Sequence, residues 1–492
     1  MKKTILQIAK YYHPVEGGIE TVTKYMGEGM KTFQNIVVCF SQDGITRVDT
    51  VNGVKVYRIA SSMNVASQDI AFSYYHYLKK IIYEEQPDII LLHCPNPFLY
   101  PITAKLAPKD VKLVLLWHSD ILGKGLLYKL VSHYEKVILK KSDLILATSP
   151  NYIHPSSPIY QYRDKTKVVP NGIILNDFTW KAGDEKTVDE IRRKYHHKKI
   201  IFFVGRHAAY KGINYLIEAE KYIQSDCIIL IGGRGPETER LKAMTHSDRI
   251  KFIGRIPNDY LRCYYYASDI FGFTSCTKQE AFGIALAEAM YCGSVPVTFT
   301  IEGSGVNWVS VKDETGIEVP LGDVQAYAAA VDKLLTDHDL YMQYATAGKD
   351  RIARMFTSKQ SVKEMKAIFN ELRGAKGDGK TKVSLTYLEL PLLIKYGFQA
   401  TDDIAILPFL GPYFSLGIAG KTKYFDGTSY TSESSFSHGF NRPDMGFKLG
   451  CGAEWNMIYA ELGYQIGVAN IADSDENTNH GNALFINIGV NF

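Results

Sequence analysis

Short apolar runs alternate with amphipathic stretches through roughly the first 370 residues of this chain. The runs are rich in β-branched and aromatic residues, as in Thr4–Ala9 and Ile200–Gly205, and a helix-like periodicity follows most of them. Such alternation is typical of α/β domains, in which helices cover a parallel sheet. Ligands of such sheets bind where the strands end, so the residues after each apolar run are the first candidates for function.

Composition limits the class of protein. The chain has 492 residues, enough for about three domains, and its hydrophobic content of 46% is that of a globular protein. The net charge of +4 is small, so we expect no nucleic-acid partner. Seven scattered cysteines without a C-x-x-C pair argue against disulfides or zinc and favour a reducing compartment. The apolar run near the N-terminus is too short for a signal peptide, so we expect a cytoplasmic protein.

The stretch from Thr274 to Pro296 places two glutamates on either side of a helix start. A loop delivers Glu280, Phe282 and Gly283 open the helix, and Glu288 follows inside it. A helix N-terminus binds anions through free N–H groups and its dipole, and Gly283 lets a phosphate come close. The pattern suits a nucleotide sugar, whose diphosphate carries hydroxyls on both flanks. Two solvated glutamates in an ordinary loop-helix-strand unit are the alternative.

Two cations follow the strand over 200–205. The planar guanidinium of Arg206 and the point charge of Lys211 together suit a diphosphate. A glycine-rich turn, GGRGP at 232–236, follows the next strand and keeps side chains out of the path of a ligand.

The N-terminal half contains similar corners. Gly17 and Gly18 lie between the first strand and a helix over 19–30, where a simple tight turn is the alternative. His118 follows the strand over 112–117, well placed to bond a substrate hydroxyl or transfer a proton, unless it merely packs under a loop. A basic amphipathic helix over 124–141 either contacts an anionic membrane surface or covers the sheet with a solvated face.

Residues 1 to about 372 resemble the family 4 retaining glycosyltransferases, which have two Rossmann-like doubly wound domains facing a cleft (the GT-B fold). The motifs that carry the resemblance are EGGIE at 16–20, WHSD at 117–120, VVPNGI at 168–173, VGRHAAYKG at 204–212, GGRGP at 232–236, FIGRIP at 252–257 and EAFGIALAEAM at 280–290. The resemblance implies an acceptor-side domain over 1–180, a nucleotide-sugar-binding domain over 198–355, and a helix over 356–373 that crosses back to the first domain.

The resemblance also implies a role for each motif residue. A UDP- or GDP-linked sugar would be the donor, with Arg206 and Lys211 on its diphosphate, Glu280 on sugar hydroxyls and Glu288 on the ribose. His118 would approach the sugar from the first domain. The other implied donor contacts come from glycines and from backbone near the phosphates and the base: Gly17, Gly18, Gly205, Gly235, Ile253, Gly254, Phe282, Gly283 and Ile284.

The family implies retention by front-face attack, in which a donor phosphate oxygen helps to deprotonate the acceptor. No D-x-D motif stands in a suitable place, so no essential metal or other cofactor is expected, and the cations would neutralise the leaving diphosphate. The domains would close about a hinge in the charged stretch 181–199. We expect Lys211→Ala and Glu280→Ala to cut turnover and leave the fold intact, since both side chains are expected on the cleft surface.

A different pattern begins after a polar linker over 374–382. Aromatic and glycine-rich segments predict five strands, at 383–398, 404–421, 445–455, 457–469 and 483–492, and the last residue is Phe492. Residues 383–492 resemble the C-terminal part of a bacterial outer-membrane β-barrel. The smallest such barrels have about eight strands, so we interpret this part as a fusion remnant; a small soluble sheet packed on the transferase is the alternative.

The leading hypothesis is a hexosyltransferase of cell-envelope glycan synthesis. It would use a polysaccharide or lipid-linked acceptor, in the cytoplasm or at the cytoplasmic face of the inner membrane, and the loops at 61–83 and 123–125 would set its specificity. The alternatives are a phosphorylase of the same fold, an outer-membrane or surface β-barrel protein, and a nucleotide-sugar-binding module without catalysis.

Overall fold

The computed structural model describes residues 2–65, 68–121, 125–372, 380–401, 403–425, 430–434, 443–455, 458–468 and 483–490. The chain divides into two compact units, Met1–Gly374 and Ala375–Phe492. Most of the predicted linker over 374–382, two residues of the predicted loop 123–125, and Phe492 lie outside the described residues.

The first sheet of unit 1 has eight strands in the order β10-β9-β8-β7-β1-β2-β4-β3, and only β3 runs antiparallel to its neighbour. Its strands are β1 (Thr4–Ile8), β2 (Gln34–Ser41), β3 (Arg47–Val51), β4 (Val54–Ala60), β7 (Ile89–Cys94), β8 (Lys112–Trp117), β9 (Leu144–Ala147) and β10 (Thr166–Val168). A small hairpin joins β5 (Met63–Val65) to β6 (Gln68–Ile70). The hairpin and α2 occupy most of the stretch 61–83 that we expected as a loop.

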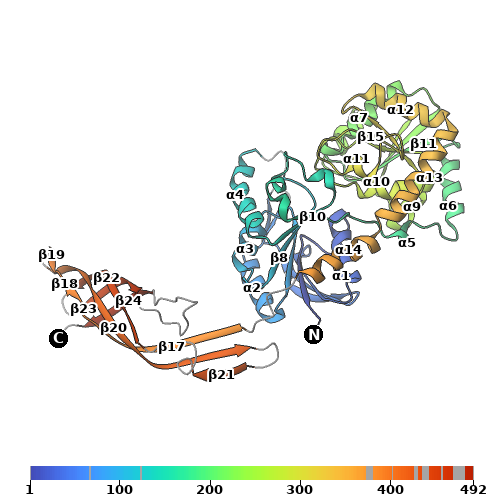
Figure 1. The fold of residues 1–492 in the computed structure, drawn as a ribbon. Coiled ribbons are helices and arrows are strands. Elements are labelled where there is room, and N and C mark those ends of the chain that lie inside the picture. The colour runs from blue at the N-terminus through green and yellow to red at the C-terminus, as the bar shows by residue number, and fades with distance from the viewer. Residues whose placement is uncertain are drawn as a thin grey trace. The chain divides into compact units, whose positions relative to one another are not determined.

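Helices cover both faces of this sheet, which is why its central strands are buried along their whole length (Figure 1). α1 (Gly18–Gly29) packs on one face, together with α14 (Ser358–Glu371). α2 (Tyr74–Glu85), α3 (Leu99–Leu106) and α4 (Gly125–Lys141) pack on the other. Among the described residues, no helix combines the length and the apolar character needed to cross a membrane.

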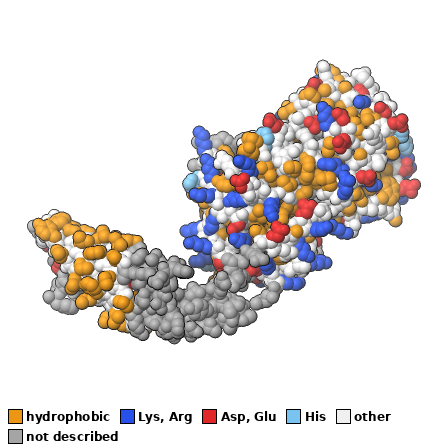
Figure 2. Space-filling view, viewed as in Figure 1, with side chains coloured by type: hydrophobic (Ala, Val, Ile, Leu, Met, Phe, Trp, Pro, Cys, Tyr) orange, Lys and Arg blue, Asp and Glu red, His pale blue; other side chains and the backbone are white. Residues whose placement is uncertain are grey.

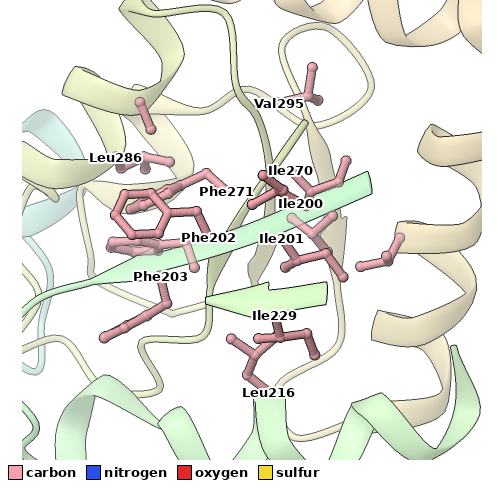
Figure 3. Close-up of a cluster of buried hydrophobic side chains, with 14 of the residues drawn as sticks. Ile200, Ile201, Phe202, Phe203, Leu216, Ile229, Ile270, Phe271, Leu286 and Val295 are labelled. Carbon is pink, nitrogen blue, oxygen red and sulfur yellow. The ribbon is translucent and has the colours of Figure 1, made fainter. Parts of the chain in front are cut away.

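The second sheet of unit 1 is entirely parallel, in the order β13-β12-β11-β14-β15-β16. Its strands are β11 (Lys199–Val204), β12 (Cys227–Gly232), β13 (Ile250–Gly254), β14 (Ile270–Phe273), β15 (Val295–Phe299) and β16 (Ile317–Val319). Its helices are α5 (Leu175–Phe178), α6 (Asp184–Lys194), α7 (Ile213–Ala219), α8 (Thr238–Ala243), α9 (Asn258–Ala267), α10 (Ile284–Tyr291), α11 (Val306–Val309), α12 (Val324–Thr336) and α13 (His338–Met355). Figure 3 shows the core around β11, where Phe202, Phe271 and Leu286 are completely buried.

In each sheet, one strand marks the point at which the strand order reverses direction. In the second sheet, β11 lies between β12 and β14; in the first, β1 lies between β2 and β7. The loops that leave the carboxyl ends of such neighbours diverge and open a crevice, which is where α/β sheets bind ligands. These two places therefore locate the candidate site. Two doubly wound sheets in one unit are the arrangement that the sequence predicts.

Two segments connect the sheets and run side by side. The amide of Ile173 donates to the carbonyl of Phe356 at 2.9 Å, and the amide of Ser358 donates to the carbonyl of Ile173 at 2.8 Å. α14 then packs on the first sheet, where Phe369 meets Phe33 edge to face at a centroid distance of 6.4 Å.

The charged stretch 181–199, which we expected as the link between the two domains, contains a helix. Residues Asp184–Lys194 form α6, which has acidic residues in its first turn and basic residues in its last. Ile191 joins the core of the second sheet, and Asp184 pairs with Arg262 of α9 at 2.6 Å. A few apolar residues on one side suffice to hold a surface helix, so a charged composition does not exclude one.

Unit 2 is an antiparallel sheet in the order β17-β20-β22-β23-β24, and β18, β19 and β21 also pair with β20. Its strands are β17 (Lys380–Pro391), β18 (Ile394–Lys395), β19 (Phe398–Thr401), β20 (Ile404–Phe425), β21 (Tyr430–Ser434), β22 (Pro443–Trp455), β23 (Ile458–Gly467) and β24 (Ala483–Val490). The predicted β-barrel-like character is confirmed. The first predicted strand is divided into β17, β18 and β19 along β20.

One face of this sheet exposes apolar side chains and the other buries charged ones, which is the reverse of a water-soluble protein. Leu410, Phe447, Leu462 and Ile486 are between 52% and 69% exposed, and Figure 2 shows apolar side chains over this surface. The other face buries Lys448 and Glu461, together with further polar residues. Lys448 pairs there with Glu389, and Lys395 pairs with Glu461 at 2.8 Å.

Candidate active site

The loops after β11 and β14 carry the charged candidates of the second domain. Arg206 and Lys211 follow β11, and Glu280 lies in the loop after β14. Because β11 and β14 are adjacent and parallel, both loops leave at the same edge of the sheet. This topology brings Lys211 and Glu280 together, although 69 positions separate them.

Lys211 and Glu280 form a buried ion pair. The Lys211 ammonium donates to Oε2 of Glu280, which also accepts from the Ser275 hydroxyl at 2.9 Å. Each charged side chain is only 11% exposed. Burial alone lowers the pKa of Lys211, but the Glu280 carboxylate and Tyr210 together outweigh it and the pKa is raised. The two side chains are therefore mostly buried, and removing either one is expected to cost stability as well as turnover.

The start of α10 faces the glycine pair of the first domain. Gly283 precedes the helix with φ of 85°, a left-handed conformation that favours glycine. A Cβ on Gly18 would lie 3.2 Å from Cδ1 of Ile284, the first residue of α10. Phe282 is buried against Phe356 at a centroid distance of 5.5 Å, so its backbone, not its ring, is available to a ligand. Gly17 immediately precedes α1.

Arg206 is exposed and lies two residues after the end of β11. Burial and the nearby Arg206 charge lower the pKa of Lys10, which follows β1 in the first domain. Cations from both domains thus lie near the same space. Gly205 lies beside Lys211, with 3.7 Å between its Cβ position and the lysine Cε.

The glycine-rich turn after β12 leaves no room for side chains. A Cβ on Gly235 would lie 2.3 Å from the carbonyl oxygen of His207. Gly254, which follows Ile253 at the end of β13, accepts a hydrogen bond from the Gly233 amide at 2.7 Å. Ile253 and Gly254, the candidate contacts of the nucleotide base, therefore adjoin the glycine-rich turn after β12. β12 lies next to β11, the strand that precedes Arg206.

Glu288 lies inside α10, where its Oε2 accepts a hydrogen bond from the Tyr265 hydroxyl at 2.8 Å. Burial raises its pKa to about 7. A carboxyl group held in this way suits a neutral hydroxyl partner, which is the chemistry that a ribose contact needs.

His118 belongs to a polar cluster of the first domain and is 6% exposed. Burial lowers its pKa to about 3, so the imidazole is neutral at physiological pH. A neutral imidazole donates or accepts hydrogen bonds, whereas its low basicity makes it a poor proton carrier. Of the two roles expected from the sequence, bonding a hydroxyl fits this geometry better.

Contacts between the domains include residues that the sequence analysis did not single out. Asp120 accepts from Trp117 Nε1 at 2.8 Å and pairs with Lys278, which lies two residues before Glu280, at 2.8 Å. Next to Gly254, a candidate contact of the nucleotide base, Glu16 accepts a hydrogen bond from Arg255 and another, at 2.7 Å, from Asn258. The WHSD and EGGIE motifs contained Asp120 and Glu16, but no sequence signal named their partners.

No group of three or more histidine, cysteine, aspartate or glutamate side chains is arranged to hold a metal ion within the described ranges.

Three family models match the chain in succession. Glycosyltransferase Family 4 matches residues 16–177, and Glycosyl transferases group 1 matches residues 184–351. Outer membrane protein beta-barrel domain matches residues 353–473, a range that begins in the last helices of unit 1.

Curated relatives and solved structures cover the same part of the chain. O-antigen chain mannosyltransferase C of Escherichia coli is 27% identical over 364 residues, which are 73% of this chain and 95% of the relative. D-rhamnosyltransferase WbpZ of Pseudomonas aeruginosa is 27% identical over 353 residues, 71% of this chain and 90% of the relative. Sucrose-phosphate synthase of Thermosynechococcus elongatus has a similar structure, with a TM-score of 0.63 at 19% identity, covering 75% of this chain and 99% of that one. Anabaena Alr3699/HepE in complex with UDP-glucose gives a TM-score of 0.61 at 16% identity, covering 75% of this chain and 100% of that one.

The models, the relatives and the two facing doubly wound sheets agree. The chain is a glycosyltransferase with two GT-B domains, matched by the Glycosyltransferase Family 4 model over residues 16–177 and by the Glycosyl transferases group 1 model over residues 184–351, and residues 353–473 match an outer membrane β-barrel domain.

Proposed function

We propose that this enzyme transfers a hexose from a nucleoside diphosphate sugar to a glycan or lipid-linked acceptor, with retention, in cell-envelope polysaccharide synthesis. The observation that carries the proposal is the meeting of Arg206, the Lys211–Glu280 pair and the start of α10 at the crevice of the second sheet, opposite Gly18. The mannosyl- and rhamnosyltransferase relatives support the hexose and the envelope glycan.

The reaction needs charge neutralisation and positioning. The bond from the sugar C1 to the diphosphate oxygen breaks while the acceptor oxygen bonds to C1 on the same face. The acceptor proton passes to a phosphate oxygen of the leaving group. Arg206, Lys211 and the N-terminus of α10 stabilise the charge that develops on the diphosphate. Glu280 orients both the ammonium of Lys211 and the sugar hydroxyls, and Glu288 holds the ribose.

The binding experiment adds UDP- and GDP-linked sugars to the full chain in detergent micelles and measures binding by thermal shift and calorimetry. Arg206→Ala is the informative variant, because Arg206 is exposed and its loss leaves no buried charge. Loss of one charged hydrogen bond, about 1.5–3 kcal/mol, weakens donor binding by about ten- to a hundredfold. Arg193→Ala is the matched control, since Arg193 is a surface arginine of α6 that is 59% exposed.

Three outcomes would refute parts of this proposal. Folded protein that binds no nucleotide sugar refutes the donor, and binding of sugar phosphates instead favours the phosphorylase. Unchanged affinity in Arg206→Ala refutes the diphosphate contact. A product of inverted anomeric configuration, read by NMR, refutes retention.

We also propose peripheral contact with the cytoplasmic face of the inner membrane through α4. Lys129, Lys136 and Lys140 are exposed on this helix, next to the exposed side chains of Tyr134 and Val137. Basic and apolar groups on one surface helix support binding to anionic lipid. Replacing the three lysines by glutamine in the full chain is expected to weaken sedimentation with anionic vesicles, and unchanged sedimentation would refute this contact.

A further inference from the structure

Three polar side chains line up at the crevice of the first sheet. Gln7 lies on β1, His93 on β7, and His118 directly follows β8, so three adjacent strands supply them. Oε1 of Gln7 is 3.1 Å from Nε2 of His93, and Nδ1 of His93 is 3.0 Å from Nε2 of His118. The two rings differ by 15° in orientation with centroids 5.2 Å apart. Together with the short N···N distance, this places them edge to edge, as an in-line hydrogen bond requires.

The order of hydrogens along this chain follows from the acceptor at its buried end. The amide oxygen of Gln7 can only accept, so Nε2 of His93 carries a hydrogen. Burial, reinforced by His118, lowers the pKa of His93 well below its usual value, so the ring is neutral and its Nδ1 is an acceptor. Nε2 of His118 therefore donates to it, and Nδ1 of the neutral His118 is left with a free lone pair.

The cluster has one competing state. If the Gln7 amide pointed the other way, its nitrogen would donate to His93, and each hydrogen along the chain would move to the opposite nitrogen. His118 would then present a donor at Nδ1 in place of an acceptor. The hydroxyl of Thr23 lies 3.3 Å from Nδ1 of His93 but donates its hydrogen to the carbonyl of Ile19 at 2.8 Å. It therefore does not compete with the hydrogen bond between the two histidines.

We infer that Gln7 and His93 are positioning residues that hold His118 as the Nε2–H tautomer, so that its Nδ1 accepts a hydrogen bond from a sugar or acceptor hydroxyl. This inference rests on the proposed function for the identity of the hydroxyl. The tautomer itself is a property of the protein without substrate, so the two can fail separately.

The experiment is histidine-selective 15N NMR of the full chain in detergent micelles, with His118 assigned from the spectrum of His118→Asn. Wild-type protein should show His118 protonated at Nε2 and unprotonated at Nδ1. Gln7→Met and His93→Leu remove the upstream acceptors and should give a mixture of tautomers or the reverse one. His93→Asn retains an amide oxygen near the position of Nδ1 and should restore the wild-type tautomer.

Activity should follow the tautomer. Gln7→Met and His93→Leu should lower kcat/KM by about two- to tenfold, the effect of one neutral hydrogen bond, and His93→Asn should recover most of it. Thr103→Val is the matched control, because it removes a buried hydroxyl of the same domain that has no hydrogen-bond partner among the described residues. It should change neither the spectrum of His118 nor the rate.

A wild-type spectrum with the hydrogen on Nδ1 of His118 would overturn the inference, even if every variant failed to fold. An unchanged His118 tautomer in folded Gln7→Met or His93→Leu would overturn it equally. The expected tautomer in a protein that binds no nucleotide sugar would uphold the positioning chain and refute the proposed donor.

Discussion

Removing one member of the Lys211–Glu280 pair should destabilise the protein as well as inactivate it. Both charges are 11% exposed, and Lys211 also lies over the rings of Tyr210 and Phe273, at 5.3 and 5.7 Å from their centroids. Breaking a buried ion pair on one side costs about 3–5 kcal/mol, because the remaining charge is left without compensation. We expect about 3 kcal/mol for Lys211→Met, since a residual exposed fraction lets water screen Glu280.

The size of the effect can be read as a melting shift. For a domain of about 150–250 residues, 1 kcal/mol corresponds to about 2–4 °C, so Lys211→Met should lower the Tm of the second domain by about 6–12 °C. Glu280→Gln keeps an oxygen for Lys211 and Ser275 to donate to, and should cost less. In the double variant neither charge remains, so its loss should be smaller than the sum of the two single losses by about 1–3 kcal/mol.

Urea unfolding of the full chain in detergent micelles, monitored by fluorescence, measures the four proteins of this cycle. Lys199→Met is the control, because Lys199 pairs with Asp269 in the same sheet but is 52% exposed, and such pairs contribute about 0–1 kcal/mol. Additive single effects, or a loss below about 1 kcal/mol for Lys211→Met, would show that the pair is not a coupled buried unit.

Two further outcomes follow from neighbouring groups. Lys278→Met should leave Asp120 buried without its cation and loosen the loop that carries Glu280. It should therefore lower kcat/KM more than the control Lys242→Met, which removes an exposed lysine. Equal rates in the two variants would contradict a role for the Lys278–Asp120 ion pair. Burial raises the pKa of Glu288 to about 7, so its proton contributes stability below the unfolded value of 4.5 that is lost as pH rises through about 7. The urea midpoint of Glu288→Gln should therefore fall less between about pH 5 and pH 8 than that of the wild type, and parallel pH profiles would contradict the assignment.

Most of the elements of unit 1 could be predicted because local pattern determines them. Apolar runs such as Lys112–Trp117 became strands with the expected bounds, and Gly283 began α10 as the sequence indicated. The hairpin of β3 and β4 was missed, although Asn52-Gly53 is a strong turn signal; both residues have positive φ, at 50° and 82°.

Contacts between distant residues could not be predicted, because they depend on strand order. Nothing near Lys211 in the sequence indicates that Glu280 neutralises it, and the pairing follows only from β11 and β14 being neighbours. His93 was hidden for a related reason. It is the fifth residue of a strand that is buried throughout, so the pattern indicated only a core strand, and its polar partners come from other strands.

We predict that unit 2 needs a different solvent from unit 1, and the full chain can test this. Leu410, Phe447, Leu462 and Ile486 remain more than half exposed. Complete burial of such a side chain contributes about 1.5–3 kcal/mol, and the exposed half forgoes its share of this, whereas the opposite face satisfies its charges in pairs such as Lys448–Glu389. We therefore expect the full chain to aggregate in plain buffer and to become monodisperse in detergent micelles, as an outer-membrane sheet does.

The effect of a new charge on the association of the full chain with micelles should depend on where the charge lies. Leu462→Arg places a cation on the apolar face and should weaken association with micelles or vesicles by about 2–4 kcal/mol if this face meets the middle of the lipid. Phe72→Arg is the control, because Phe72 is an exposed apolar residue of unit 1 at 78% exposure. Detergent-independent solubility of the wild type, or equal effects of the two substitutions, would show that the apolar face does not contact lipid and is covered by protein instead.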